Sequence, residues 1–123
     1  MLRMFSYRKP LTAHRVAELK VKVAYRKVLR LGLRRGDKVH LVIKLYGKWR
    51  YAWFYFGSVA SERVYFLGGL LVDGKYQGIH SIRHTWLISG IKSYNFLMEC
   101  AKKAKHKKTI EEIVDIVNTI EEE

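Results

Sequence analysis

Residues 38–56, KVHLVIKLYGKWRYAWFYF, carry the strongest structural pattern of the chain. Polar and apolar residues alternate on both sides of Gly47, as in two strands that each turn one face toward a core. Gly47 and Lys48 supply a tight turn, so we expect an antiparallel hairpin. One face of the first strand carries Lys38, His40, Lys44 and Tyr46. One face of the second strand carries Trp49, Tyr51, Trp53 and Tyr55.

Helices are predicted on both sides of this hairpin. Thr12 is a good N-cap, and the apolar spacing after it predicts a helix over about residues 12–31. Residues 61–72, SERVYFLGGLLV, lack alternation and are long enough for a second helix. Residues 79–90 are expected to form two short strands, and residues 93–108 a helix.

The chain of 123 residues predicts a single domain, 1–123. Residues 1–10 form a basic extension, and residues 109–123 an acidic C-terminal helix that Thr109 caps. The expected order of elements is α-ββ-α-ββ-α-α. We therefore predict an α+β fold, with helices on one face of an antiparallel sheet of about four strands. The other face of the sheet would be open to a partner.

The charge of the chain is strongly positive and unevenly distributed. Its 24 Lys and Arg against 11 Asp and Glu give a formal net charge of +13. All 24 cations lie in residues 1–108, which hold only five acids and so carry +19. A fold does not require this excess, which increases self-repulsion. A polyanionic partner is the simplest explanation, and nucleic acid is favoured over an anionic membrane surface. The chain has a single glutamine and many Lys and Arg, a composition that suggests a heat-adapted source. The surfaces of heat-adapted proteins usually mix positive and negative charges, so heat adaptation explains this positive excess poorly.

The hairpin combines cations with aromatic rings. Exposed aromatic residues on a strand can stack on bases, while interleaved cations contact phosphates. The aromatic row could instead pack on helices, so the face of the first strand is the better candidate. The predicted nucleic-acid-binding residues are Lys38, His40, Lys44, Lys48, Arg50, Arg83 and His84.

Residues 66–74, FLGGLLVDG, form the most specific motif of the chain. Two adjacent glycines in an exposed helix cost about 1 kcal/mol each, and close approach of a second backbone would compensate. Two such helices, packed at Gly68 and Gly69, would bring two copies of Asp73 together. Paired carboxylates beside a phosphate path are the ingredients of divalent-metal phosphodiester hydrolysis. Alternatively, this is a core helix in which Asp73 only helps the turn.

The stretch SERVYFLGGLLVDG, residues 61–74, resembles the signature helix of the LAGLIDADG homing endonucleases. Residues 86–104 resemble the strand and helix that follow this motif, although the hairpin upstream would make the order permuted or truncated. In that family, glycines let two motif helices pack closely, and the terminal acid binds the catalytic metal. The resemblance implies that Gly68 packs helices and that Asp73 is the catalytic, metal-binding residue. It further implies Mg²⁺ as cofactor and a homodimer that cleaves DNA.

Two functions remain open from the sequence. The first is this metal-dependent DNA endonuclease. The second is a non-catalytic DNA- or RNA-binding module, such as a regulator or a ribonucleoprotein component, in which Asp73 is structural. In both, nucleic acid is the partner, and DNA is favoured over RNA.

Several other classes of protein are excluded by the sequence. The single cysteine, Cys100, rules out an internal disulfide or a multi-cysteine zinc site. His80 and His84, in a predicted strand, would lie about 13 Å apart and could not share one ion. ATP and dinucleotides are not indicated, because the glycine-rich phosphate-binding motifs are missing. Without a long apolar run or a secretory signal, we expect a cytoplasmic protein that does not bind a membrane.

Overall fold

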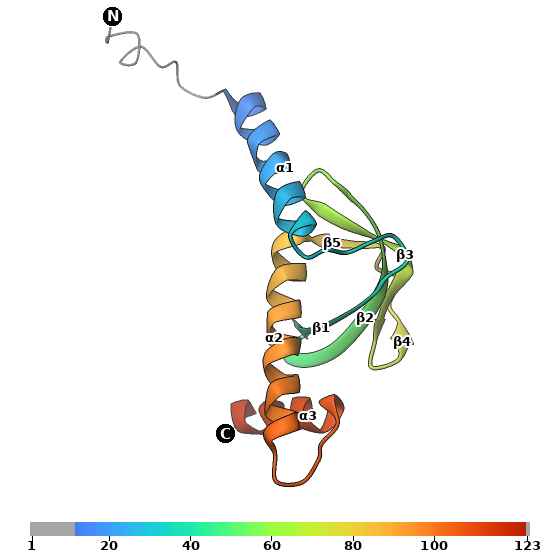
Figure 1. The fold of residues 1–123 in the computed structure, drawn as a ribbon, viewed down its shortest axis with the longest axis vertical. Helices are drawn as coiled ribbons and strands as arrows, with labels where there is room; N and C mark the ends of the chain where they lie inside the picture. Colours follow the sequence, from blue (N-terminus) through green and yellow to red (C-terminus); the bar gives the residue numbers. More distant parts are fainter. Residues whose placement is uncertain (1–11, 123) are drawn as a thin grey trace, which may run out of the picture.

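The computed structural model describes residues 12–122, so the basic extension over residues 1–10 lies outside the described residues. Three helices and five strands make up the fold (Figure 1). In chain order these are α1 (Ala13–Leu29), β1 (Lys38–Leu45), β2 (Lys48–Ala60), β3 (Arg63–Val72), β4 (Lys75–Tyr76), β5 (Ser81–Arg83), α2 (His84–Lys103) and α3 (Ile110–Glu122). The predicted α+β class is confirmed.

The hairpin of β1 and β2 forms in the predicted antiparallel arrangement. Lys38 lies opposite Tyr55, and His40 lies opposite Trp53. Directly opposed residues point to the same face of a sheet. The cations of β1 and the aromatic row of β2, which the sequence left as separate candidates, therefore share one face.

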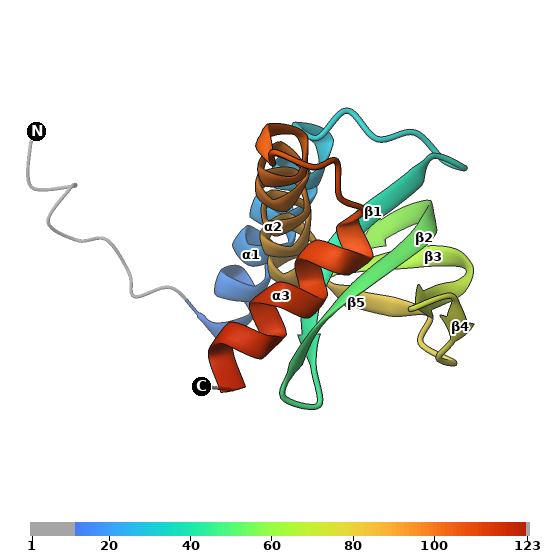
Figure 2. The same cartoon turned by 90° about the horizontal axis from the view of Figure 1, so that it is seen from below.

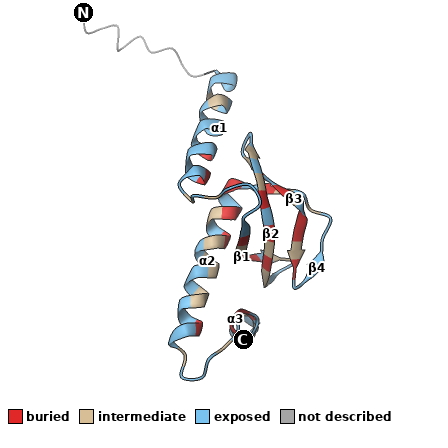
Figure 3. Ribbon diagram, turned by 45° about the vertical axis from the view of Figure 1, so that its right-hand side comes forward, coloured by how far each residue is buried: buried red, intermediate tan, exposed pale blue. Residues whose placement is uncertain are grey.

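The opposite face of the sheet packs on the helices and forms the core. Leu41 of β1 and Phe54 of β2 are fully buried there, together with Leu87 of α2 and Val28 of α1. Figure 3 marks buried residues on α1, on α2 and on the strands of the sheet. The first part of α1 extends beyond the sheet (Figure 1), which explains why Ala24 and Val28 are its only buried residues.

Helix α3 lies against the other face of the sheet, at the end nearest the turn between β1 and β2 (Figure 2). Val42, Ile110 and Val114 form a second apolar cluster there. The helix begins as predicted, with the Thr109 hydroxyl accepting a hydrogen bond from the Glu112 backbone N–H at 3.2 Å. The second face is therefore partly covered, rather than fully open as predicted.

Residues 61–72 do not form the predicted helix, because residues 63–72 are strand β3. Pairing with β2 changes register between Trp53–Leu71 and Tyr55–Leu67. Gly68 lies in this irregularity with φ of +91°, a conformation that disfavours residues with a Cβ. Gly69 is buried beneath the ring of Tyr76. The prediction that these glycines pack two helices is thus wrong.

The region before α2 also differs from the prediction. Only residues 81–83 form a strand, and α2 begins at His84, nine residues before the predicted start at Ser93. Its N-cap residue, Arg83, makes no side-chain capping hydrogen bond, so the sequence lacks the usual start signal. No helix within residues 12–122 has the length and apolarity needed to cross a membrane.

Candidate nucleic-acid interface

The open end of the second sheet face carries a cation above aromatic rings. The ammonium of Lys38 lies 4.2 Å from the ring centroid of Trp53, a cation–π contact. The rings of Trp53 and Tyr55 meet edge to face at 5.5 Å, and 43% of Tyr55 is exposed. We name Lys38, Trp53 and Tyr55 the sheet platform. It offers π-surface and positive charge side by side, which is the chemistry that binds bases and phosphates.

His40 lies beside the platform in a stack of rings. Its centroid is 5.1 Å from that of Tyr94 and 5.8 Å from that of Tyr51, and its Nδ1 hydrogen-bonds the Tyr51 hydroxyl. Burial, followed by the charge of Lys38, lowers the pKa of His40 below 6.5. Burial also raises the pKa of Tyr51 to about 12. His40 is therefore neutral at pH 7 and provides a ring surface rather than a charge.

The other end of this face lies under the last turn of α3. Glu121 approaches Lys44 at 3.6 Å and accepts a hydrogen bond from the indole Nε1 of Trp49 at 2.8 Å. Glu122 approaches Lys48 at 3.6 Å. Two predicted nucleic-acid contacts, Lys44 and Lys48, are thus already paired with carboxylates of the same chain.

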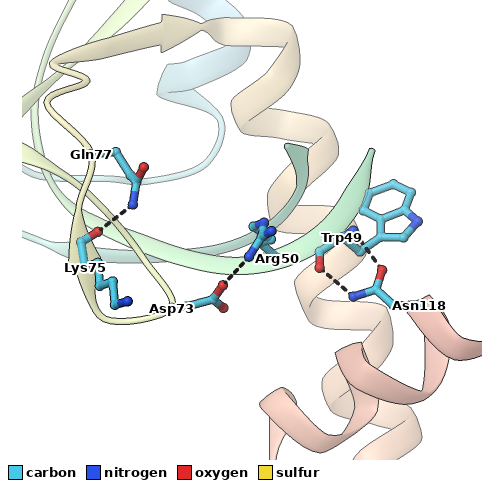
Figure 4. A network of polar contacts seen from close by, with 6 residues as sticks. All are labelled: Trp49, Arg50, Asp73, Lys75, Gln77 and Asn118. Carbon is cyan, nitrogen blue, oxygen red and sulfur yellow. Dashed lines mark hydrogen bonds and ion pairs between the residues drawn. The ribbon is translucent and has the colours of Figure 1, made fainter. Parts of the chain in front are cut away.

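Asn118 fixes α3 in this position. Its amide NH₂ donates to the Trp49 carbonyl, and its amide oxygen accepts from the Trp49 backbone N–H, both at 2.8 Å (Figure 4). This pair of bonds satisfies both backbone groups of one residue in β2. The position of α3 is therefore specified by polar as well as apolar contacts.

Arg50 is not part of the sheet platform. It pairs with Ile43, whose side chain lies in the core, and so it faces away from Trp53. Its guanidinium forms an ion pair with Asp73 at 3.0 Å (Figure 4). Arg50 therefore holds the turn after β3 to β2, and its charge is neutralised there.

Asp73 occupies the turn between β3 and β4, with φ of +52°. Its backbone N–H donates to the Tyr51 carbonyl at 3.0 Å, so the residue is fixed by both backbone and side chain. It lines a cleft of about 380 Å³ that also contains Glu111 and Asp115 of α3. Within residues 12–122, no three His, Cys, Asp or Glu side chains converge as metal ligands. In this chain the Asp73 carboxylate is instead paired with the Arg50 guanidinium. Mg²⁺ binding by paired copies of Asp73 stays a prediction.

Arg83 and His84 lie away from the sheet platform, where β5 meets α2. His84 is 7% exposed, and its Nδ1 donates to the Glu62 carbonyl at 3.1 Å, so it anchors this junction. Arg83 is exposed and lines a hollow of about 530 Å³ together with Lys20 and Arg63. Of the seven predicted residues, Lys38, His40 and Lys44 thus share the sheet face and Lys48 lies at its covered end, whereas Arg50, Arg83 and His84 lie elsewhere.

Sequence reasoning missed several residues of these surfaces. The predicted binding residues do not include Trp53 and Tyr55, although the register of the hairpin places them opposite His40 and Lys38. Lys20 and Lys27 lie within the first predicted helix, and their spacing of seven residues, which places both on one side of a helix, was the available signal. Arg63 could not be found, because its segment was expected to be helical.

Comparisons with known proteins give no match. No family model matches the chain, and neither the curated proteins nor the solved structures contain a match. The resemblance to LAGLIDADG endonucleases therefore rests on the motif alone, and the segment that carries it is a strand.

Proposed function

We propose that this protein is a nucleic-acid-binding module that uses the sheet platform to hold single-stranded DNA or RNA. The observation that carries the proposal is the Lys38–Trp53–Tyr55 arrangement, with a cation 4.2 Å from an aromatic centroid on an open strand face. Bases must be unstacked from a duplex before they can stack on such rings, which favours single strands.

The charge of the chain supports the same proposal. Of the cations on this face, Lys38 has no carboxylate within 4.0 Å among residues 12–122, whereas Lys44 and Lys48 each have one. The carboxylates of Glu121 and Glu122 already form ion pairs with Lys44 and Lys48 at the covered end of the face, which supports anion binding by lysines on this face. A phosphate offers the same oxygen chemistry.

Of the two functions open from the sequence, the geometry favours the non-catalytic module. The endonuclease needed two motif helices and paired copies of Asp73, but the motif segment is a strand and Asp73 is paired with Arg50. With one cysteine, Cys100, the chain forms no internal disulfide, which suits a reducing, cytoplasmic setting.

A binding assay with labelled oligonucleotides tests this function. Fluorescence anisotropy would compare single-stranded DNA, single-stranded RNA and duplex DNA across a range of salt concentrations, with and without Mg²⁺. We expect single-strand binding whose log–log salt slope is about −0.7 for each phosphate neutralised, without strand cleavage. Binding that is insensitive to salt would contradict the proposal.

A further inference from the structure

A second positively charged surface lies where α1 meets α2. It consists of two adjoining hollows of about 530 Å³ and about 430 Å³, which share Thr85 as a wall. We name this surface the basic cleft. The cations that line it are Lys20, Lys27, Arg30, Arg63, Arg83 and Lys92.

The charge of the basic cleft is almost unopposed. Glu62 is the one acid among the described residues that line it. None of its six cations has a carboxylate within 4.0 Å in the described part of the chain. Arg63 donates instead to the hydroxyl and the carbonyl of Ser81. Concentrated charge in a hollow between low-dielectric walls attracts anions more strongly than isolated surface lysines do.

The lining of the basic cleft differs in chemistry from the sheet platform. Among residues 12–122, the buried His84 is the one aromatic side chain that lines it, whereas the hydroxyls of Ser61, Thr85 and Ser89 also line it. Cations and hydroxyls bind phosphate oxygens, and without exposed rings the cleft offers nothing for a base to stack on. The cleft is therefore suited to the outside of a duplex, whose bases are hidden.

The length of the cleft also fits a phosphate backbone. Lys20 and Lys27 are seven residues apart on α1, which is about 10 Å along a helix axis. One strand of a B-form duplex presents about three phosphates over that distance. Several phosphates can thus be contacted at once.

We propose that the basic cleft binds the phosphate backbone of a DNA duplex while the sheet platform holds a single strand. One molecule would then join a duplex to a single-stranded segment. The single-strand site rests on the proposed function, whereas the duplex site does not.

The experiment compares two triple variants with the same change in charge. The first variant removes three cations of the basic cleft through Lys27→Gln, Arg30→Gln and Lys92→Gln. The second variant is the control, and it removes three exposed cations around the end of α2 through Lys103→Gln, Lys105→Gln and Lys107→Gln. Anisotropy of a labelled duplex of about 20 base pairs is measured against salt, and thermal melts confirm that both variants fold.

We expect the cleft variant to lose up to about 2.7 from the magnitude of the log–log salt slope, since each phosphate contact contributes about 0.9. Its duplex affinity should fall at least tenfold, whereas the control should change by less than about threefold. Equal losses in the two variants would overturn the proposal. So would wild-type binding to vesicles containing phosphatidylserine without binding to the duplex.

A second readout separates this proposal from the proposed function. Wild-type protein should hold a labelled duplex and a labelled single strand in one ternary complex. The cleft variant should retain the single strand and lose the duplex. Loss of both ligands together would overturn the assignment of two separate surfaces. Failure of single-strand binding, with duplex binding still dependent on the cleft, would contradict only the proposed function.

Discussion

The indole Nε1 of Trp49 donates a hydrogen bond to the Glu121 carboxylate at 2.8 Å, across 72 positions of the chain. The same carboxylate group approaches Lys44 at 3.6 Å. An acidic side chain of α3 thus satisfies both the ring donor and the cation at the covered end of the sheet face. A phosphate that reached this end would have to replace it.

Removing the charges at the end of α3 should therefore strengthen nucleic-acid binding. For Glu121→Gln with Glu122→Gln we expect single-strand affinity to rise about two- to thirtyfold, because the two exposed ion pairs contribute about 0.2–1 kcal/mol each. The salt slope should steepen by about 1.4 as Lys44 and Lys48 become available to phosphates. Oligonucleotide anisotropy measures both quantities.

The matched control is Glu111→Gln with Asp115→Asn. These acids lie on the same helix, and the change in net charge is the same. Neither residue forms an ion pair with Lys44 or Lys48. An equal rise in affinity for the two double variants would show that only net charge matters.

The Arg50–Asp73 pair should contribute little to stability. Both side chains are partly exposed, so the pair is worth about 0–1 kcal/mol, and asparagine tolerates the φ of +52° at this position. Asp73→Asn should lower the free energy of unfolding by less than about 1 kcal/mol and leave oligonucleotide affinity within about twofold. If wild type cleaves DNA with Mg²⁺ and Asp73→Asn does not, the endonuclease hypothesis is right instead.

The stability of the protein should decrease in mild acid because of His40. Burial and Lys38 hold its pKa below the value of 6.5 that it has in the unfolded chain. The unfolded state then binds the proton more readily, so the free energy of unfolding falls as the pH drops below about 6.5 and levels off below the folded-state pKa. Urea denaturation across this pH range measures the decrease. In His40→Gln, the free energy of unfolding should decrease less over this pH range than in wild type. If it decreases by the same amount, groups other than His40 cause the effect.

The contact between α2 and β1 leaves no room for a side chain at Gly90. A Cβ there would lie 2.9 Å from the Cβ of Leu41 and 3.0 Å from the Cγ2 of Ile43. Helix propensity favours alanine by about 1 kcal/mol, but overpacking of a core costs about 1–3 kcal/mol. We expect Gly90→Ala to destabilise the protein in thermal or urea melts. Ser89→Ala, at the exposed neighbouring position, should be neutral or slightly stabilising.

The sequence predicts the parts of the fold that depend on local pattern. Strict alternation in residues 38–56 predicts the hairpin, and Thr12 and Thr109 mark the starts of two helices that the structure confirms. Strand β3 was missed because both of its sides are apolar and the irregular pairing at Gly68 interrupts the alternation. A continuous apolar run of this kind does not separate strand from helix.

The candidate sites depend more on contacts between distant residues. The position of α3 depends on Asn118 meeting Trp49, and no local pattern encodes a contact between residues 69 positions apart. The basic cleft likewise needs α1, the β2–β3 turn and the start of α2 to meet. The cations could be counted from the sequence, but their division between two surfaces could not.

The central claim is that the sheet platform binds nucleic acid, and the affinity of Trp53→Ala for a single-stranded oligonucleotide tests it most directly. The control is Phe96→Ala, which removes an exposed ring from α2; 68% of the surface of Phe96 is accessible. Stacking is worth about 1–3 kcal/mol per base, so Trp53→Ala should raise Kd roughly 5- to 150-fold. Phe96→Ala should leave Kd within about twofold of wild type. Equal Kd values for the two variants, with both folded, would contradict the account.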